Sequence, residues 1–485
     1  MVKKHPTRLD LIEASKKTLT RRDFLKIAGI TAGATVMAAV APQAVFANPL
    51  PSQKPEPATL DVWWFTDIPD LNVPADPEEI PAYGGQARAA FIPWLAKHPG
   101  VKLNITAHSW ANELRANQLT AIASHNIPDT TYGESFVNEF ARMGIYSPVS
   151  RHAAELFTHG PMAEAKLDDK FYGLPAFVGT TALMINLDVL ERCGLPTDPA
   201  HLPTTWDQLL RDARAVSKVN LSPDLSTYNA YYTISPGSNY GTPMRVLPWF
   251  NQNHAPLSDE EGHPSANSKK AVDTWVWHNA LMATSDPGSY AVDAYWNLNA
   301  GAFAYMMGWT GDIWLQGAYA AWFGSGNPRM VAVPLPLPPG GRPSNIVIGN
   351  ALISAFKRGH HPDLALALVE EAWTQEDAQE YMAEYGSIFV PALKSLLKQW
   401  KTYDKLDAFP TDNSKEMARF TMRELLDDDV DSLPRWPNNT PQCWTDWNSS
   451  YNAIWGGNLS KDGIKTELDS LQKKLQADIH SKQAW

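Results

Sequence analysis

Residues Asp168–Pro196 read DDKFYGLPAFVGTTALMINLDVLERCGLP, and this stretch says most about the fold. Turn-forming residues at Tyr172–Pro175 precede an uncharged, apolar run that is typical of a buried strand. Asn186 follows this run, and Gly194-Leu195 lie eight residues further on.

A strand, a helix and a second strand are predicted on the N-terminal side of this stretch. Leu60–Phe65, LDVWWF, is a short run of β-forming residues, and Val101–Thr106, VKLNIT, alternates with a period of two. Ile68–Gly85 is rich in proline and glycine and is predicted to be a loop. The helical segment after it ends at Pro99-Gly100. Strand, helix and strand at this spacing predict a parallel α/β sheet.

Two further helices are predicted on the C-terminal side. Thr205 and Gln208 have the spacing of a capping box, in which each side chain binds the backbone N–H of the other residue. A second helix is expected to begin at Pro362, since proline favours the first helical turn, and to end near Gly386.

The N-terminal segment carries the features of an export signal. Arg21 and Arg22 lie in TRRDFLK, and the uncharged run Ile27–Val40 follows them, which matches a twin-arginine signal. That run is too short to span a bilayer, which takes about 20 residues. We expect cleavage after Ala47, so that residues 1–47 are removed once the folded protein has crossed through the twin-arginine translocase. Residues 48–57 are proline-rich and are predicted to form an extended tether.

The charge and the cysteines exclude several classes of partner. The net charge of the chain is −11, and residues 1–47 are basic, so the exported part is more acidic still. Such a protein is a poor partner for nucleic acid or for an anionic membrane surface. No other run is long and apolar enough to span a bilayer. Neither Cys193 nor Cys443 follows the signal, so we expect no lipid anchor.

Motifs for catalysis or for a cofactor are absent from the sequence. It contains no Cys-x-x-Cys, no His-Glu-x-x-His, no Gly-x-Gly-x-x-Gly and no phosphate-binding loop with lysine. Asp427, Asp429 and Asp431 are spaced like the first ligands of a calcium loop. Ser432 and Asn438 replace the glycine and the glutamate that such a loop needs. We therefore expect neither a metal nor a cofactor.

Two pairs of residues leave alternatives open. Tyr231 and Tyr232 are similar to the tyrosine pair of ferric-ion binders, but no nearby histidine or carboxylate completes a ligand set. An oxidising compartment allows a disulfide between Cys193 and Cys443. Two separate buried thiols, which behave as small apolar side chains, are the alternative.

Several segments, in order, resemble the extracellular solute-binding proteins of ABC importers, the branch that includes maltose-binding and other sugar-binding proteins. Asp168–Pro196 is similar to the segment in which that family first crosses between two lobes. The chain departs from the family pattern by its long loop Ile68–Gly85 and by the absence of an acidic residue at Gly179-Thr180. The other similar segments are PTTWDQLL (203–210), NAGAFAYMMGWTGDIW (299–314), VAVPLPLPPGG (331–341), IGNALISAFKRGHHPDLALALVEEAW (348–373) and YGSIFVPALKS (385–395).

The resemblance implies an α/β, two-lobed periplasmic-binding-protein fold. Each lobe would contain a mainly parallel sheet flanked by helices, and hinge crossings would join the lobes. Residues 58–176 and 350–392 are expected to form lobe one, and residues 177–349 and 393–485 are expected to form lobe two. The ligand would bind between the lobes, which close around it by a hinge motion.

Candidate ligand-binding residues follow from the predicted strand ends and from the resemblance. Aromatic faces pack on the C–H surfaces of a sugar, while carboxylates, amides and indole N–H groups bind its hydroxyls. Trp309 matches the family's ligand-stacking tryptophan, and Trp447 resembles a second aromatic of that site. Core packing is the alternative for each of the 19 tryptophans. The candidates are Phe65, Thr66, Asp67, His108, Ser109, Trp110, Tyr132, Glu134, Ser135, Trp249, Asn251, Trp309, Asp312, Arg435, Trp436 and Trp447.

Three functions remain open at this stage. The first is a monomeric periplasmic or extracellular protein, without catalytic activity, that binds a carbohydrate such as an oligosaccharide and delivers it to an ABC permease. The second is a binding protein for a non-sugar solute such as a glycerol phosphate or an iron chelate. The third is an exported carbohydrate-active enzyme.

Overall fold

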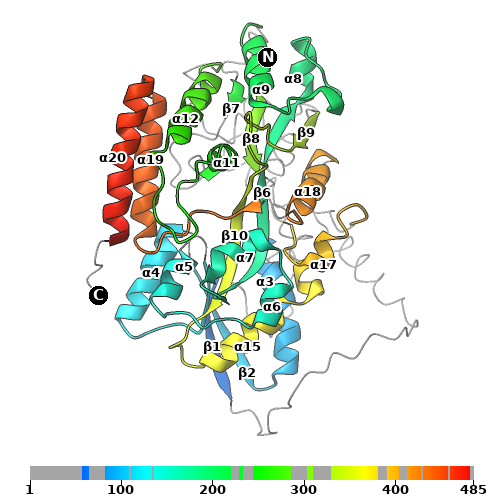
Figure 1. The fold of residues 1–485 in the computed structure, drawn as a ribbon. Coiled ribbons are helices and arrows are strands. Elements are labelled where there is room, and N and C mark those ends of the chain that lie inside the picture. The colour runs from blue at the N-terminus through cyan, green and yellow to red at the C-terminus, as the bar shows by residue number, and fades with distance from the viewer. Residues whose placement is uncertain are drawn as a thin grey trace, which may run out of the picture.

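The computed structural model has two lobes joined by long strands (Figure 1). In that view β1, β2 and α15 lie in the lower lobe, β7, β8, α9 and α12 lie in the upper lobe, and β6 and β10 run between them. The α/β fold predicted from the sequence is thereby confirmed. The structure describes residues 57–64, 82–108, 111–133, 136–219, 229–232, 244–285, 303–309, 329–380, 390–403, 412–427, 430–456 and 459–480.

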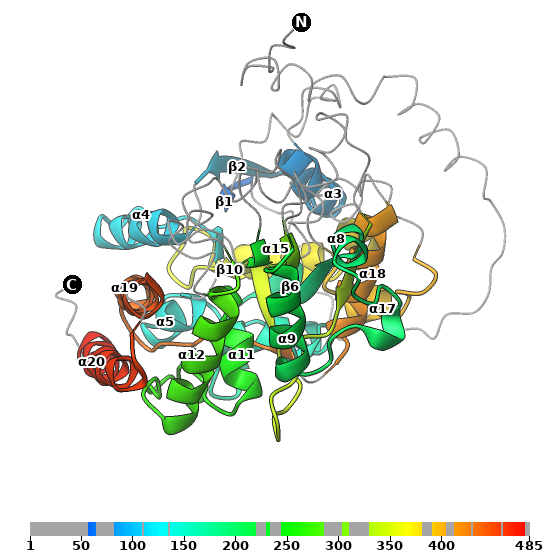
Figure 2. The ribbon, with the colours of Figure 1, turned by 90° about the horizontal axis from the view of Figure 1, so that it is seen from above.

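The lower lobe contains the strands and helices that precede β6, together with α15 from the C-terminal half of the chain. Figure 2 shows this lobe and the upper lobe from above, with α4 and α3 on opposite sides of β1 and β2. Its elements are β1 (Ala58–Trp64), α3 (Ala82–Lys97), β2 (Val101–Ala107), α4 (Ala111–Ala123), β3 (Thr130–Gly133), α5 (Val137–Arg142), α6 (Arg151–Glu155), α7 (His159–Ala165), β4 (Lys166–Leu167), β5 (Lys170–Phe171) and α15 (Pro362–Trp373).

The upper lobe and the segments around the crossing contain the remaining elements. They are β6 (Leu174–Asn186), α8 (Leu187–Arg192), the 3₁₀ helix Pro199–His201, α9 (Trp206–Val216), β7 (Asn229–Tyr232), α11 (Leu247–Gln252), α12 (Lys269–Met282), β8 (Phe303–Trp309), β9 (Met330–Val333), β10 (Asn345–Ala355), α17 (Lys394–Leu397), α18 (Asp412–Glu424), β11 (Val430–Asp431), α19 (Thr440–Gly456) and α20 (Lys461–His480).

One hydrogen-bonded sheet runs through both lobes in the order β2-β1-β3-β10-β6-β8-β7. β1 is parallel to β2 and to β3, as the spacing of the two N-terminal strands predicts. β10 is antiparallel to β3 and to β6, and β6 is antiparallel to β8 and β9. β6 and β10 therefore connect the sheet of the lower lobe to that of the upper lobe.

Two large groups of buried side chains form the cores of the lobes. The lower core includes Leu60, Trp64 and Trp373, and the upper core includes Leu183, Trp206 and Trp275. The chain after residue 392, which we expected in lobe two, divides between them. Leu396, Leu397, Met422, Leu425 and Val430 pack in the lower core, whereas Met417 and Phe420 of α18 pack with Met184 and Met306 of the upper sheet. The buried residues between 433 and 479 pack in the upper core.

Local sequence signals explain where two of the helices begin. Thr205 accepts a hydrogen bond from the backbone N–H of Gln208 at 3.2 Å, and Gln208 accepts one from the N–H of Thr205 at 3.1 Å, so the predicted capping box is confirmed. α15 begins at Pro362 as predicted but ends at Trp373, earlier than expected. Trp373 is fully buried against Trp64, with ring centroids 5.3 Å apart, and after a break at Thr374-Gln375 the chain is helical again at residues 376–380.

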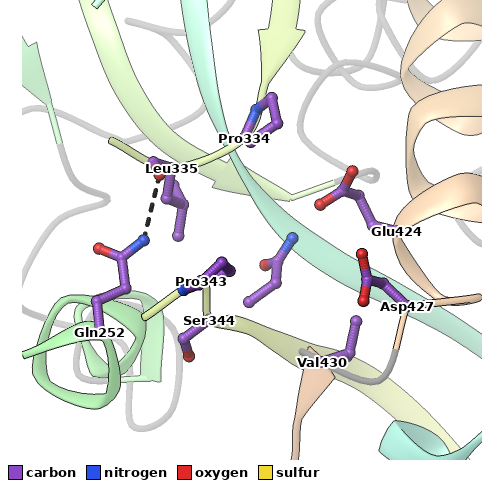
Figure 3. Close-up of a pocket in the computed structure, with 9 residues that line it drawn as sticks. Gln252, Pro334, Leu335, Pro343, Ser344, Glu424, Asp427 and Val430 are labelled. Carbon is purple, nitrogen blue, oxygen red and sulfur yellow. Dashed lines mark hydrogen bonds between the residues drawn. The ribbon is translucent and has the colours of Figure 1, made fainter. Parts of the chain in front are cut away.

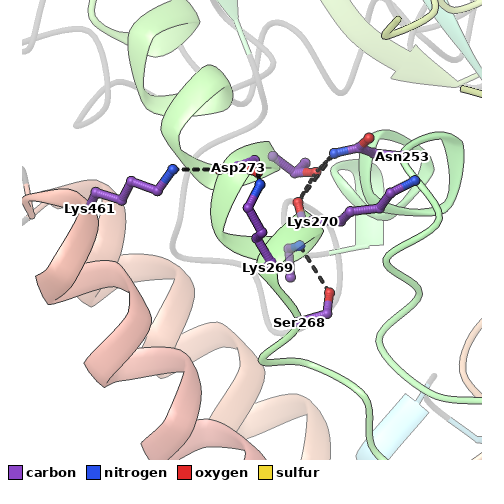
Figure 4. A network of polar contacts seen from close by, with 8 residues as sticks. Asn253, Ser268, Lys269, Lys270, Asp273 and Lys461 are labelled. Carbon is purple, nitrogen blue, oxygen red and sulfur yellow. Dashed lines mark hydrogen bonds and ion pairs between the residues drawn. The ribbon is translucent and has the colours of Figure 1, made fainter. Parts of the chain in front are cut away.

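The C-terminal helices α19 and α20 pack on each other and on α12 of the upper lobe. Asp273 of α12 accepts hydrogen bonds from Lys269 at 2.9 Å and from Lys461 of α20 at 2.7 Å (Figure 4). The bonds from Lys461 and Lys269 lower the pKa of the Asp273 carboxyl. The ion pair attaches the start of α20 to the upper lobe.

Cys193 and Cys443 are free thiols, which decides between the two alternatives left by the sequence. Burial raises the pKa of both thiols, so both are neutral at pH 7. Within the described residues, no helix combines the length and the apolar character that crossing a membrane would take.

Candidate functional site

The carboxyl ends of strands from the two lobes point toward each other. β3 ends at Gly133, which pairs with Leu352, and the parallel strand β1 ends beside it. β8 ends at Trp309, which pairs with Thr181 of β6, and β7 runs parallel to β8. Because Leu352 also pairs with Pro175, only the stretch between Pro175 and Thr181 separates the two sets of ends. Ligands of open α/β sheets bind outside the carboxyl ends of the strands, so this junction is the candidate site.

His108 is the first residue after β2 and lies at this junction. Its backbone N–H donates to the carbonyl of Trp64 at 2.6 Å, and its own carbonyl accepts from the hydroxyl of Tyr132 at 2.6 Å. Its ring stacks on Trp63, with 3.8 Å between the ring centroids and 27° between the planes. Three contacts therefore fix the position of the imidazole.

The chemistry of His108 suits a neutral hydrogen-bonding role. Burial lowers the pKa of its imidazole, and this effect exceeds the opposing influence of Glu113. Nδ1 lies 3.4 Å from Nδ2 of Asn117, and Nε2 is buried without a hydrogen-bond partner in the described part of the chain. A neutral imidazole has one donor and one acceptor nitrogen, which is what a hydroxyl ligand requires.

Most of the other predicted residues lie outside the part of the chain that the structure describes. These are Phe65, Thr66 and Asp67 after β1, Ser109 and Trp110 after β2, Glu134 and Ser135 after β3, and Asp312 after β8. Trp309 is described as the last residue of β8, but its side chain is not among the described ones. The strands that precede these residues do end at the junction, and a ligand role for the residues stays a prediction.

The structure places four predicted aromatic residues in the cores, and we reassign them from the ligand to the fold. Trp249 packs edge-on against Trp206 and Trp277, and its Nε1 donates to the hydroxyl of Tyr231 at 3.2 Å. Tyr132, Trp249, Trp436 and Trp447 are all at most 1 % exposed.

The rings of Trp436 and Trp447 pack on other aromatic rings of the upper lobe. Trp436 contacts Trp444 at a centroid distance of 4.9 Å, and Trp447 contacts Phe250 and Trp275, each at 5.7 Å. These rings fill space between α11, α12 and α19, which the rest of the upper core closes off. Their burial is therefore explained by helix packing alone.

Asn251 and Arg435 take part in polar contacts beside the crossing. Oδ2 of Asp431 accepts hydrogen bonds from Arg342 at 2.8 Å, Ser344 at 2.5 Å and Asn251 at 3.2 Å. Arg435 donates to the carbonyl of Ala163 at 3.4 Å. The aspartate whose spacing is calcium-like thus binds an arginine, a serine and an asparagine, and its role is structural.

Two groups of residues at the junction were missed by sequence reasoning. Trp63, on which His108 stacks, precedes the residues selected after β1, and the alternation along the strand signals that it faces away from the buried Trp64. At the crossing itself, Thr181 donates to Oδ1 of Asn345, and Thr180 donates to the carbonyl of Ile346 at 3.1 Å. These hydroxyls bond β6 to β10 where the family has an acidic residue.

A buried carboxylate also joins the lobes, and no local sequence signal identifies it. Glu139 of α5 forms an ion pair with Arg115 of α4, and the Arg115 Nε lies 3.0 Å from Oε2. The same carboxylate accepts from the backbone N–H groups of Asn439 at 3.0 Å and Thr440 at 3.4 Å, at the start of α19. A helix start has unsatisfied N–H groups and a partial positive charge, so a carboxylate there is favourable.

Metal ligation finds little support among the described residues. Asp259, Glu261 and His263 are close enough to share an ion, but all three are exposed, and Asp259 already accepts from the backbone and ring of His263. Tyr231 is fully buried, its hydroxyl accepts from Trp249, and burial raises its pKa. A phenolate at Tyr231 is therefore disfavoured, which removes one of the two tyrosines that the iron alternative needs.

Comparison with known proteins identifies the family. The sequence profile of the bacterial extracellular solute-binding proteins matches residues 73–380. The chain belongs to this family. The matched segment includes the crossing strands β6 and β10, and α15. Of the predicted loop Ile68–Gly85, residues 68–81 lie outside the described residues, and residues 82–85 belong to α3, so the predicted end of the loop was wrong. This solute-binding protein is thus a member of a family of binding proteins found in the periplasm or outside the cell.

Named relatives of this solute-binding protein are similar to it at low sequence identity. The arabinooligosaccharide-binding protein of Bacillus subtilis (strain 168) is 21 % identical over 301 residues, which cover 59 % of this chain and 66 % of the relative, just under two thirds. The GacH receptor of Streptomyces glaucescens GLA.O, solved without ligand and with acarbose, is 17 % identical, with a TM-score of 0.64 over 86 % of this chain and 98 % of that one.

A second solved structure gives the same result. The sugar-binding protein MalE from Xanthomonas citri is 17 % identical and superposes with a TM-score of 0.64, covering 86 % of this chain and 97 % of that one. The two-lobed binding-protein fold expected from the sequence is therefore confirmed for this solute-binding protein.

Proposed function

We propose that this chain is the solute-binding component of an ABC importer, that it binds a carbohydrate between its lobes, and that it delivers this ligand to the permease. The observation that carries the proposal is the meeting of strand carboxyl ends from both lobes at the β6–β10 crossing. Membership of the solute-binding family supports it. The relatives named above bind an arabinooligosaccharide, acarbose and sugar, which supports an oligosaccharide as the ligand.

The proposal includes the division of the chain into lobes. We assign residues 58–176 and 350–392 to lobe one, as the sequence indicates, and residues 177–349 to lobe two. The two separate cores support this division. Residues 396–430 contact both lobes, because they pack in the lower core and also, through Met417 and Phe420 of α18, on β6 and β8. Residues 433–485 complete lobe two. Hinge closure would then occur about β6, β10 and the third crossing, where Val178 pairs with Val390.

Neither alternative function gains support from the site. A glycerol phosphate would need cations or several free N–H groups, and the described residues after the strand ends supply a neutral imidazole instead. A protein of this family is expected to release its ligand unchanged. Chemically altered sugar after long incubation with the pure protein would favour a carbohydrate-active enzyme.

The first test is a binding measurement on the mature protein. We expect thermal stabilisation by an oligosaccharide from a panel that also contains monosaccharides, phosphate esters and metal ions. At a hundredfold excess over Kd, ligand binding should add about 2.7 kcal/mol to the free energy of unfolding. Stabilisation by a phosphate ester or metal, and by no sugar, would contradict the proposal.

The second test separates ligand stacking from core packing at Trp309. Trp309→Ala should weaken ligand binding by roughly 2–4 kcal/mol, as loss of a central aromatic contact does, and should change the stability of the empty protein by less than about 1 kcal/mol. The matched control is Trp275→Ala, because Trp275 is a core residue of the same lobe. That variant should lose about 3–5 kcal/mol of stability.

The third test concerns export. Replacing both Arg21 and Arg22 by lysine should leave the precursor in the cytoplasm, because the translocase recognises the guanidinium pair. Cell fractionation and the size of the retained protein give the result. Normal export of the double variant would show that these arginines are not an export signal.

A further inference from the structure

β6, β10 and β11 pass from one core to the other side by side. In β10 the change falls between Ile346, which packs in the upper core, and Val347, which packs in the lower core. Val347 pairs with Thr180 of β6, and Ile346 pairs with Asp431 of β11. Figure 3 shows the start of β11 at Val430 beside the start of β10. A rotation of one lobe against the other would therefore bend the chain at this row of residues.

A second set of contacts joins the lobes away from this row. The carboxylate of Glu139, on α5 of the lower lobe, accepts hydrogen bonds from the backbone N–H groups of Asn439 at 3.0 Å and Thr440 at 3.4 Å. These two residues begin α19, which packs in the upper core through Trp444 and Trp447. Glu139 therefore caps a helix of the other lobe.

Neighbouring hydrogen bonds join the same parts of the two lobes. Glu164 of α7 is 1 % exposed, and its carboxylate accepts from the backbone N–H of Leu433 at 3.3 Å. Leu433 packs in the upper core. Arg142, at the end of α5, donates to the carbonyl of Glu261 at 3.4 Å, in the segment before α12. The contact between α5, α7 and the upper lobe is thus made by several polar groups.

This contact and the proposed ligand site lie on different sides of the crossing strands. Figure 2 shows β1 and β2 on one side of β6 and β10, with α5 and α11 on the other. In the sheet order β2-β1-β3-β10, the lower strands extend from the crossing toward β2, so the ligand site at their carboxyl ends opens on that side. When two lobes rotate about a hinge, groups on the closing side approach and groups on the opposite side separate.

We infer that Glu139 is a positioning residue that holds the lobes apart in the empty protein and releases α19 when they close around a ligand. The inference rests on the proposed function, because it concerns closure of the same interlobe site. The apparent affinity of a site falls with the fraction of protein that is in the binding-competent form, so a contact made only in the open form weakens binding. Loss of the contact should therefore tighten ligand binding although it removes a stabilising interaction.

Glu139→Ala tests this role, and Asp129→Ala is its matched control. Asp129 is also a fully buried carboxylate that caps a helix, since its Oδ1 accepts from the backbone N–H of His361 at 2.7 Å, but α15 belongs to the same lobe. In calorimetric titrations the probes are acarbose and an arabinooligosaccharide, which the relatives bind. Glu139→Ala should bind a probe about tenfold more tightly than the wild type, because hydrogen bonds to charged groups shift equilibria by about that factor or more. Asp129→Ala should keep the wild-type affinity.

Small-angle X-ray scattering of the same proteins without sugar gives a second measurement. Empty Glu139→Ala should have a smaller radius of gyration than the wild type and Asp129→Ala, because more of its molecules are closed. A residue that only stabilises the fold would change neither the affinity upward nor the radius downward. Glu139→Gln, which keeps one oxygen for α19, should change both in the same direction by less, and it replaces Glu139→Ala if that variant does not fold.

A chemical cross-link tests the contact without removing Glu139. Arg142→Cys and Glu261→Cys place two exposed thiols on the two lobes beside the contact. Cys193→Ser is added so that the partly exposed native thiol does not react. A short bismaleimide between the new thiols should hold the lobes open and weaken probe binding by at least about tenfold. The same protein with each thiol capped by N-ethylmaleimide should bind as the wild type does.

Tighter binding and a smaller radius for the Glu139 variant, with neither change in Asp129→Ala, support the inference. Unchanged or weaker binding by a folded Glu139 variant overturns it, and so does full affinity of the cross-linked protein. If the wild type binds neither probe, the proposed ligand class fails, and the radii of the empty proteins decide the role of Glu139. Equal radii for the wild type and the Glu139 variant then overturn the inference, and a smaller radius for the variant supports it.

Discussion

Glu139 of the lower lobe and His278 of the upper lobe are buried in opposite ways. Glu139 is 1 % exposed and forms an ion pair with Arg115, with further bonds to two N–H groups at the start of α19. In the upper lobe His278 is fully buried between aromatic rings, and neither ring nitrogen has a hydrogen-bond partner among the described residues. Burial lowers the pKa of His278 to about 3, so the ring is neutral. Glu139 is thus buried in an ion pair, whereas His278 is buried as a neutral ring.

The largest expected effect comes from breaking the charged pair. Glu139→Ala leaves Arg115 buried without its partner and removes the acceptor from the start of α19, so the free energy of unfolding should fall by about 3–5 kcal/mol. Denaturant unfolding at neutral pH measures the loss. Glu139→Gln, which keeps an oxygen for the amides, is the matched control and should lose less. A loss below about 1 kcal/mol for Glu139→Ala would mean that pairing in the lower lobe contributes little.

The next effect should appear as a pH dependence of the upper lobe. The folded-state pKa of His278, about 3, lies below the unfolded value of 6.5, so acid protonates the unfolded chain first and stability falls as pH drops from 6.5 toward 3. Each pH unit in this window is worth about 1.4 kcal/mol. Between pH 6.5 and 4 the wild type should therefore lose about 3 kcal/mol more than His278→Phe. If the free energies of unfolding of the wild type and of His278→Phe fall equally with pH, His278 does not cause the pH dependence and the contrast with Glu139 fails.

The smallest expected effect tests whether neutral hydrogen bonds also differ between the lobes. Tyr132→Phe removes the bond to the carbonyl of His108 in the lower lobe, and Thr205→Ala removes the capping box in the upper lobe. Each should lower stability by about 1 kcal/mol. If both variants lose the same stability at every pH, the lobes differ only in how they bury ionisable groups. If one variant loses much more than the other, the lobes also differ in the strength of their neutral hydrogen bonds.

Local patterns were sufficient to predict much of the fold. Val101–Thr106 alternates along a strand whose neighbours are close in sequence, and Thr205 and Gln208 cap a helix within one turn. The helix predicted from Pro362 to near Gly386 is interrupted at Thr374-Gln375 and resumes at residues 376–380. No proline or glycine marks this interruption, so local sequence signals predicted where the helix begins and missed the break.

The candidate site was harder to predict for the same reason. Trp249 and Trp447 have the same local sequence pattern whether their helix faces meet ligand or protein, and the contacts of Phe250 with Trp447 decide it only after folding. Glu139 is separated by 24 residues from Arg115 and by 300 from Asn439, so no spacing rule could join them. His108 was predicted because it follows a strand that the sequence identifies, whereas Trp63, the ring on which it stacks, was missed although it lies near the end of β1.

The position of β10 in the sheet has a consequence for synthesis of the chain. β3 pairs with β10 between Gly133 and Leu352, so the strand beside β3 is translated long after it. At about 5–20 residues per second, roughly 10–40 s pass between the two strands. During that interval one edge of β3 has its N–H and C=O groups exposed, which invites pairing with other chains. A ribosome that stalls before residue 355 would release a chain whose first sheet is incomplete, and chaperones or proteases would have to act on that edge.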